Sequence, residues 1–258
     1  MCAEDANVHV TSDRAAWLVG PSNKCSNPAP QPVRPYRLVL LGAPGVGKGT
    51  QAELLSQQTA ACHLSTGDIF RAAKSLDACR CTPAMTAAMD YMRRGDLVPD
   101  ETVLAILRER GKCLRCSGGF LLDGFPRTLA QAQALDGLLA TMNVKLDAVI
   151  DYRLPMDEII SRLSGRRTCV KCRAVYHVET RPPQVENTCD TCGGELVQRE
   201  DDRPESVRVR MSAYLHSTAP LIEFYQPRGL LITVDAHGSP WEIFGRTMRE
   251  LRVREICG

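Results

Sequence analysis

The sequence predicts an α/β protein in which a parallel sheet is covered by helices on both faces. Three observations support this fold class. Short apolar runs recur along the chain, segments with helical periodicity follow them, and the first apolar run leads into a glycine-rich turn. Alternating strands and helices favour parallel pairing, because a crossover is needed to bring each new strand back beside the last.

The chain is long enough for one such domain with inserted lobes. It has 258 residues, of which 44% are hydrophobic, and no feature indicates two unrelated domains. Clear strands are expected at 36–42, 120–123, 146–152 and 230–234, with a further short segment at 62–65. Helices are expected at 48–58, 68–75, 83–94, 100–110, from about 129, 155–163, 204–226 and 241–253.

The first strand leads directly into the run GAPGVGKGT at 42–50, which is typical of a phosphate-binding loop. Glycines let backbone N–H groups surround phosphate oxygens, and the start of the following helix adds its positive end. Lys48 supplies a charge for the β- and γ-phosphates. The generic pattern places Ser or Thr directly after the lysine, whereas here Gly49 intervenes before Thr50. The strand, turn and helix together predict a P-loop NTPase-type fold.

A carboxylate follows the apolar run at 120–122. Asp123 is expected at the carboxyl end of a buried strand, where ligands bind in open α/β sheets, and it is suited to hold Mg²⁺ through water. Arg127 is expected to contact a phosphate. Gln131 is expected on the same helical face as Arg127, and its amide, with a donor and an acceptor, suits an adenine edge.

The overall charge gives no reason to expect a large anionic partner. A net charge of +2 with 24% charged residues does not favour nucleic acid or a membrane surface. No apolar run approaches the roughly 20 residues of a membrane span. Residues 1–35 lack the basic start and apolar stretch of a secretion signal, so we expect a disordered leader and a cytoplasmic protein.

Residues 167–200 interrupt the alternation of strands and helices. They contain Cys169, Cys172, Cys189 and Cys192 as two Cys-x-x-Cys pairs separated by sixteen residues, a strong signal of a tetrahedral metal site. Zn²⁺ is expected in a structural role, because four protein ligands leave no open position; iron remains an alternative. The twelve cysteines also include Cys79, Cys81, Cys113 and Cys116, and nothing in the sequence brings those four together as a second site.

The ordered set of motifs resembles the adenylate kinase family. It comprises the loop at 42–50, LSTGD at 64–68 with Arg71, GDLV at 95–98, LDGFPRT at 122–128 with Gln131, RLSGRR at 162–167, and RxDD at 199–202 followed by Arg210. The resemblance covers Tyr36 to the C-terminus, and Gly-Lys-Gly-Thr is this family's normal form of the loop. It implies a nucleoside monophosphate kinase domain at 36–258, with an AMP-binding helical lobe at 66–98 and a long zinc-bearing lid at 166–203.

The resemblance also implies roles for individual residues. Contacts to ATP are implied for Gly45, Val46, Gly47, Lys48, Gly49, Thr50, Arg162, Arg166, Val175 and Tyr176. Contacts to AMP are implied for Thr66, Gly67, Arg71, Leu97, Val98, Gly124, Arg127, Gln131, Arg199 and Arg210. The catalytic set is expected to be Lys48, Asp123, Arg127, Arg166, Arg199 and Arg210. Such convergence of cations suits phosphoryl transfer, in which two polyanions must be aligned and the transition-state charge neutralised.

The expected activity is therefore reversible transfer from Mg-ATP to AMP, giving two ADP, in a monomer whose lid closes to exclude water. Three alternatives stay open. The first is that the acceptor is UMP, CMP or dAMP. The second is that the chain is a nucleotide-binding or zinc-ribbon interaction protein without catalysis, and the third is that the leader adds a partner contact or a location signal. Gln131 and the long lid favour AMP over pyrimidines, and the arginine set favours an enzyme.

Overall fold

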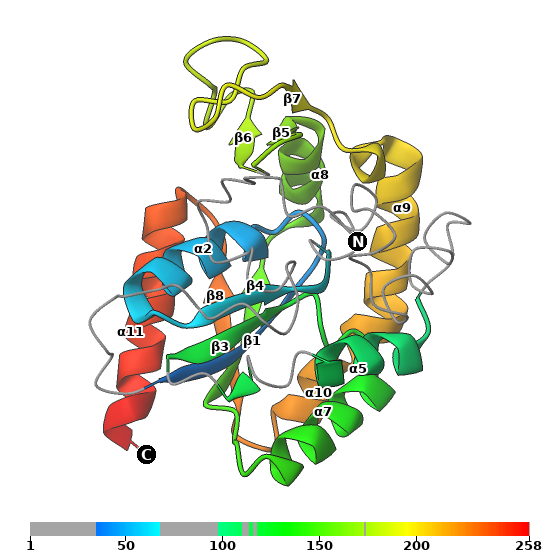
Figure 1. Ribbon diagram of the computed structural model, residues 1–258, viewed down its shortest axis with the longest axis vertical. Helices are drawn as coiled ribbons and strands as arrows, with labels where there is room; N and C mark the ends of the chain where they lie inside the picture. Colours follow the sequence, from blue (N-terminus) through cyan, green and yellow to red (C-terminus); the bar gives the residue numbers. More distant parts are fainter. Residues whose placement is uncertain (1–34, 68–97, 110–113, 116–117, 173, 258) are drawn as a thin grey trace, which may run out of the picture.

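The computed structural model describes residues 35–67, 98–109, 114–115, 118–172 and 174–257. Within these ranges a parallel sheet carries helices on both faces, and a small antiparallel sheet projects from one end of the molecule (Figure 1). The predicted fold class is thus confirmed. All of the expected leader except Pro35, the helices expected at 68–75 and 83–94, and most of the expected lobe at 66–98 lie outside the described residues.

The central sheet has five parallel strands in the order β2-β3-β1-β4-β8. Their bounds are β1 Tyr36–Gly42, β2 Cys62–Ser65, β3 Gly119–Asp123, β4 Ala148–Arg153 and β8 Leu231–Asp235. Every predicted strand is present, with ends shifted by at most two residues. Because β1 is central, the loop that follows it opens at the middle of the sheet's carboxyl edge, the position where ligands bind in this kind of fold.

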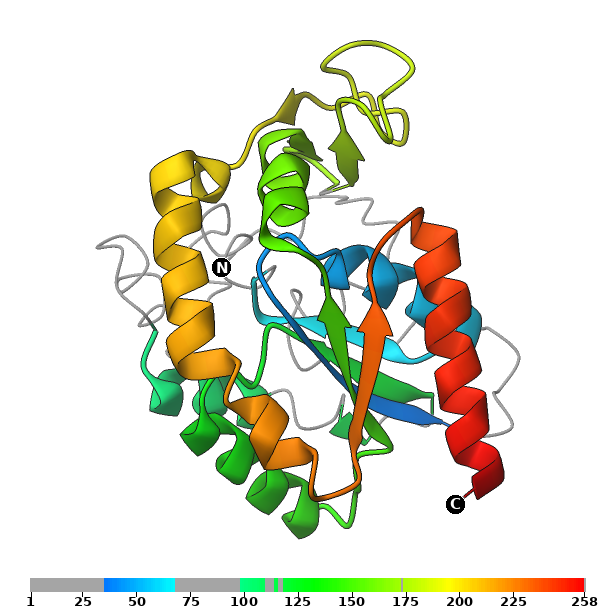
Figure 2. The same cartoon turned by 180° about the vertical axis from the view of Figure 1, so that it is seen from behind.

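Helices cover both faces of the sheet (Figures 1 and 2). On one face lie α2 Lys48–Thr59 and α11 Pro240–Cys257; on the other lie α5 Asp100–Glu109, α7 Leu129–Thr141 and α10 Leu221–Tyr225. Two more helices, α8 Met156–Ser164 and α9 Pro204–Ala213, lead into and out of the small sheet. No helix in the described part of the chain is both long and apolar enough to cross a membrane.

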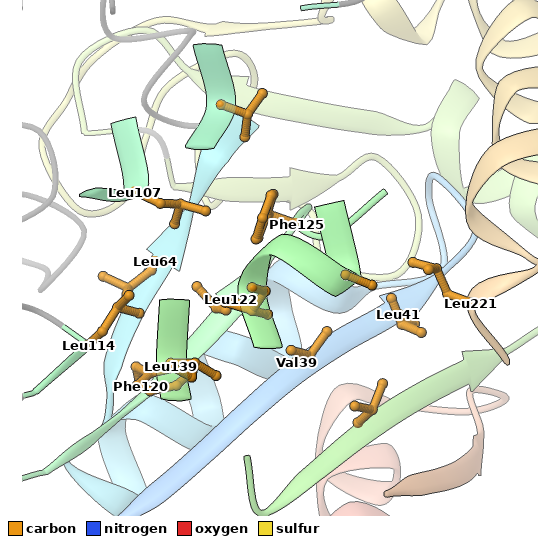
Figure 3. Packing of buried hydrophobic residues seen from close by; sticks show 14 of the residues in the cluster. Val39, Leu41, Leu64, Leu107, Leu114, Phe120, Leu122, Phe125, Leu139 and Leu221 are labelled. Atoms are coloured by element: carbon orange, nitrogen blue, oxygen red, sulfur yellow. The ribbon is translucent and has the colours of Figure 1, made fainter. Parts of the chain in front are cut away.

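Strand residues alternate between two apolar cores. In β1, Leu38 and Leu40 pack toward α2 and α11, while Val39 and Leu41 pack toward α5, α7 and α10. Figure 3 shows the second of these cores, where Leu122 and other strand residues meet side chains from the helices. Burial on both faces explains why the strands read as continuous apolar runs in the sequence.

The interrupting segment forms its own sheet. Strands β5 Arg166–Cys169, β6 Val175–His177 and β7 Leu196–Val197 pair antiparallel in the order β6-β5-β7. This sheet stands above the end of α8 in Figure 1 and carries a small core of cysteine, tyrosine and leucine side chains. A core this small needs further stabilisation, which a bound metal can supply in a small domain.

The expected single helix at 204–226 is wrong. The chain forms α9, then one π-helical turn η3 Tyr214–Thr218, then α10. Pro220 lies in this stretch, and proline has no N–H to donate and its ring clashes with the carbonyl four residues earlier. The chain accommodates the proline by widening the helix, and Ala219 donates its N–H to the oxygen of Tyr214, five residues back, at 2.9 Å.

Candidate active site

The glycine-rich loop joins β1 to α2. Gly45 has a φ of +88°, and a Cβ there would meet Cγ of Leu163 at 2.6 Å, so glycine is required where α8 approaches the loop. Val46 anchors the loop, with 1% of its surface exposed. No side chain caps the start of α2 at Gly47 and Lys48. The first N–H groups of this helix are therefore suited to bind an anion.

Lys48 lies inside this loop. Its Nζ donates hydrogen bonds to the carbonyl oxygens of Gly42 at 2.6 Å and Ala43 at 2.9 Å. Burial lowers the pKa of Lys48 to about 8; the Asp123 carboxylate opposes this shift, and the guanidinium groups of Arg127, Arg210 and Arg166 add to it. The carboxylate and the three arginines therefore lie close enough to the ammonium group to change its pKa.

Asp123 ends β3 beside the ends of its neighbouring strands. It is in register with Leu40 of β1 and Ser65 of β2. The side chain is 14% exposed, and its Oδ2 lies 3.5 Å from Nε2 of His63, which is itself buried. The predicted strand-end position is therefore confirmed, and oxygen ligands of this kind suit Mg²⁺.

Arg127, in the segment after β3, makes three hydrogen bonds that hold it in place. Its Nε donates to the Gly124 oxygen at 2.8 Å, and its backbone N–H donates to Oε1 of Gln131 at 2.7 Å. Its backbone oxygen accepts the Thr218 hydroxyl at 2.9 Å, which links it to the π-helical turn. Gln131 is 4% exposed, and its Nε2 also donates to Oδ1 of Asp100 at 2.6 Å.

The expectation that Arg127 and Gln131 share a helical face is wrong. Helix α7 begins at Leu129, and Thr128 is its N-cap, accepting the Gln131 N–H at 3.1 Å. Arg127 therefore precedes the helix. The two residues meet because the glutamine side chain reaches back to the backbone of the preceding turn.

Two arginines meet at Asp202, in the turn before α9. Nε of Arg166 donates to Oδ2 of Asp202 at 2.8 Å, and its Nη2 pairs with Oδ1. Nη1 of Arg210 lies 3.5 Å from the same Oδ1 and 3.0 Å from Oδ2 of Asp201. The buried Asp202 side chain therefore holds Arg166 by two contacts and lies beside Arg210, which also donates to the Asp201 backbone oxygen at 2.7 Å.

Helix α9, which carries Arg210, packs directly on the phosphate-loop region. Ala43 of the loop, Leu163 of α8 and Met211 of α9 belong to one buried apolar cluster. This packing explains how a residue about 160 positions after the loop comes within electrostatic range of Lys48.

Arg199 and Arg162 lie at the two sides of this group. Nε of Arg199 donates to the Thr168 hydroxyl at 2.8 Å. Arg162 donates to the Val46 oxygen at 3.2 Å and to the Ala236 oxygen at 2.8 Å, so it bridges the phosphate loop and the end of β8. Burial lowers the pKa of Arg162.

The four cysteines of the small antiparallel sheet region converge. The sulfur atoms of Cys169, Cys172, Cys189 and Cys192 all lie within 4.8 Å of one another, and two of the pairs are 3.5 Å apart. Four sulfurs at 2.3 Å from a tetrahedral Zn²⁺ are roughly 3.8 Å apart, so the donor set fits this ion. Gly194 leaves room for the site, since a Cβ there would meet the Cys169 sulfur at 2.9 Å.

Backbone N–H groups also point at the sulfurs. Those of Lys171 and Cys172 bond to Cys169, and those of Thr191 and Cys192 bond to Cys189. Burial raises the pKa of Cys189, but its hydrogen bonds, with that from the Tyr176 hydroxyl foremost, outweigh burial and bring the pKa to about 6. This pattern favours a thiolate at Cys189, the form that binds a metal.

The other predicted site residues have varied placements. Thr66 is buried and donates to the Gly124 oxygen at 3.0 Å, and Gly67 follows it. Val98 packs against the core beside α5 and α7. Val175 and Tyr176 lie in β6 of the small sheet. Gly49 and Thr50 are in the first turn of α2. Arg71 and Leu97 lie outside the described residues, as do Cys79, Cys81, Cys113 and Cys116.

Sequence reasoning missed two residues that organise the site. Asp202 ends the RxDD motif, and Asp100 is the first residue of α5. Each acid lies more than 30 positions from Arg166 or Gln131, its partner, so no local pattern in the sequence indicates the contact.

The fold and the site define a phosphotransferase of the P-loop class, a nucleoside monophosphate kinase. A family model described as adenylate kinase matches residues 40–230. The chain is 48% identical over 216 residues to an adenylate kinase of Carboxydothermus hydrogenoformans, covering 84% of this chain and 99% of the relative. It is 50% identical over 216 residues to one of Acidothermus cellulolyticus, covering 84% and 98%, and 48% identical over 198 residues to one of Archaeoglobus fulgidus, covering 77% and 89%. The chain belongs to the adenylate kinase family.

Proposed function

We propose that this chain transfers the terminal phosphoryl group of ATP, supplied with Mg²⁺, to AMP and forms two ADP. The observation that carries the proposal is the convergence of Arg127, Arg166 and Arg210 on Lys48 and Asp123, at the carboxyl edge of the sheet. Phosphoryl transfer needs positioned cations more than covalent chemistry, and this arrangement supplies them.

On the donor side, the phosphate loop and α8 hold ATP. The backbone of Gly45, Val46, Gly47, Gly49 and Thr50 surrounds the β- and γ-phosphates, and Lys48 adds its charge. The low pKa of Lys48 reflects its buried position among arginines, and an anion bound there raises the pKa again and keeps the ammonium charged. Arg162, which bridges the loop and β8, lies against the base and ribose, with Val175 and Tyr176 on the lid side.

On the acceptor side, the segment after β3 holds AMP. Its phosphate lies against Arg127, and Thr66, Gly67, Gly124 and Val98 form its surroundings together with Arg71 and Leu97. Gln131 is proposed to read the adenine edge. In this conformation its amide is engaged by Asp100 and by the Arg127 N–H. AMP therefore replaces one of these bonds, which makes base recognition sensitive to the position of Asp100.

The transferring group is proposed to lie between the two sides. Arg127, Arg166, Arg199 and Arg210 neutralise its charge as it moves. Asp123 would hold Mg²⁺, which would supply further charge neutralisation at the phosphates. Asp202 keeps Arg166 and Arg210 oriented before substrate arrives, which reduces the reorganisation needed at the moment of transfer.

The small sheet is proposed to be a lid that closes over both substrates and keeps water from acting as the acceptor. Cys169, Cys172, Cys189 and Cys192 would hold Zn²⁺, which contributes to lid stability without taking part in transfer. One zinc per chain is expected by elemental analysis. Iron in its place, or a folded lid without metal, would contradict this assignment. The monomeric state and the cytoplasmic location stay predictions.

The deciding experiment measures ADP formed from ATP plus AMP, dAMP, UMP or CMP in a coupled assay. AMP should be the best acceptor. ATP binding without ADP formation would instead indicate a binding protein, and a better rate with a pyrimidine nucleotide would contradict the acceptor assignment.

Site variants sharpen this test. Arg210→Ala should lower turnover by a factor on the order of 10² or more, because it removes a charge that acts in the transition state. The matched control is Arg208→Ala, two residues away on the exposed face of α9, which should leave turnover unchanged. Equal rates for the two variants would remove Arg210 from the catalytic set.

A further inference from the structure

Tyr176 has a hydroxyl group that lies in the proposed metal centre. The residue is in the middle of β6, is 5% exposed, and packs with Cys169, Cys189 and Leu196 in the small lid core. The resemblance placed it on the donor-nucleotide side. Its polar atom, however, lies 3.5 Å from the Cys189 sulfur.

The hydrogen bonds of this hydroxyl group determine where its proton points. A phenol oxygen has one proton to donate and two lone pairs to accept with. The Tyr176 oxygen accepts the backbone N–H of Asp190 at 2.9 Å and lies 3.5 Å from the Cys189 sulfur. A metal-bound cysteine is a thiolate, which has no proton to donate. In the metal-bound site the hydrogen bond between the two groups therefore uses the hydroxyl proton of Tyr176.

A hydrogen bond to a metal-bound thiolate withdraws charge from the sulfur and holds it in place. Groups that contact metal ligands in this way tune affinity, and their loss commonly costs 10–100-fold in metal binding. Two backbone N–H groups already reach Cys189, so the hydroxyl adds a third donor to this sulfur, and it comes from strand β6, a separate segment of the chain.

We propose that Tyr176 is a positioning residue of the metal centre, whose hydroxyl donates to the Cys189 thiolate and sets the affinity of the lid for Zn²⁺. The inference rests on the zinc site assigned under the proposed function. It also links the metal to the reaction, because Tyr176 is paired with Arg167 across the sheet and the next pair joins His177 to Arg166. The metal thereby stabilises the strand that presents Arg166.

The test uses the full chain and the Tyr176→Phe variant, which removes one oxygen and keeps the ring. Zinc affinity, measured by competition with a chromophoric chelator, should fall by about 10–100-fold. With Co²⁺ in place of zinc, the sulfur-to-metal charge-transfer band should move to lower energy, because a thiolate that loses a hydrogen bond is more electron-rich. A role confined to packing would not move this band.

The matched control is Thr188→Val, which also removes a lid hydroxyl. That hydroxyl donates to the Glu186 oxygen at 3.3 Å and is not among the contacts of the sulfurs. It should leave zinc affinity and the cobalt spectrum unchanged. A change in both variants of the same size would overturn the specific role of Tyr176.

A measurement on the unaltered chain covers the case in which Tyr176→Phe does not fold. With ¹¹³Cd²⁺ bound, the Tyr176 hydroxyl proton should show scalar coupling to cadmium through the Cys189 sulfur, and an observed hydroxyl proton without coupling would overturn the inference. If the unaltered chain binds neither zinc nor cadmium, the zinc assignment itself fails. If it binds them and Tyr176→Phe binds equally with an unshifted cobalt band, only the tyrosine inference fails.

Discussion

Asp202 offers a sharp test of how two of the arginines proposed to be catalytic are held. Its buried carboxylate receives Arg166 through two contacts and lies 3.5 Å from Nη1 of Arg210. Asp202→Asn preserves the shape of the side chain but removes its charge and replaces one acceptor by an N–H donor. One guanidinium contact then becomes donor against donor, and both arginines lose their common anchor.

The size of the effect follows from burial. Breaking a fully buried ion pair costs about 3–5 kcal/mol. Here Arg166 and Arg210 are 17% and 31% exposed, so water solvates part of the freed charge. We therefore expect a loss of about 1–3 kcal/mol in the free energy of unfolding, or a fall in Tm of about 3–10 °C for a chain of this size. Misplacement of the arginines by about 1 Å should lower kcat by roughly 10–100-fold.

The adjacent acid supplies the control. Asp201 is 40% exposed and pairs with Arg210 at 3.0 Å, so Asp201→Asn should cost at most about 1 kcal/mol, as for a surface ion pair. Turnover is measured by the coupled ADP assay and stability by thermal unfolding. If the two variants lose the same small amounts of activity and stability, the reasoning that Asp202 organises the site is refuted.

Three further predictions concern the loop and the acceptor side. In Lys48→Met, turnover should be largely lost. The free energy of unfolding of the unaltered chain, relative to that of this variant, should rise by about 2 kcal/mol between pH 8 and 10.5. It rises because the lysine of the folded state, with its lowered pKa, releases its proton at a lower pH than the lysine of the unfolded state. Gly45→Ala should lose about 1–3 kcal/mol of stability, since it combines a positive φ with a clash, and should bind ATP more weakly. Thr218→Val should raise KM for AMP a few-fold and leave KM for ATP unchanged, because it frees the backbone of Arg127.

A control variant or a contradicting outcome tests the cause of each of these three effects. A pH-independent stability difference for Lys48→Met would contradict the burial of a charged lysine. Gly137→Ala, at an exposed site in α7 with nothing within 4 Å of the new Cβ, should stabilise by about 0.5–1 kcal/mol, in contrast to Gly45→Ala. Thr218→Ser keeps the hydroxyl and should keep KM for AMP; equal effects in the serine and valine variants would remove the role of the hydrogen bond.

Local pattern was enough to predict most of the fold. The strands at β1, β3 and β4 are buried on both faces, so each appears as a continuous apolar run bounded by glycine or aspartate. Helix α11 extends beyond its predicted end, and the stretch at 204–226 contains a π-helical turn. Both errors concern how a helix ends or widens, which depends on packing and on single residues such as Pro220 more than on periodicity.

Prediction of the site had a similar limit. The positions of Lys48 at the start of α2 and of Asp123 at the end of β3 were predictable, because each follows from an adjacent apolar run and turn in the sequence. The engagement of the Gln131 amide with Asp100 was not predicted, because the two residues are 31 positions apart and meet only through the packing of α5 on α7.

The sequence by itself determined the glycine-rich loop, the strands of the central sheet, the family and the cluster of four cysteines, because each of these depends on residues that are close together in the chain or recur at fixed spacing. Only the tertiary structure decided that Asp202 holds Arg166 and Arg210, and that the Tyr176 hydroxyl meets Cys189. These contacts join separate strands, turns and helices, so they exist only after the sheet and the lid have brought those elements together.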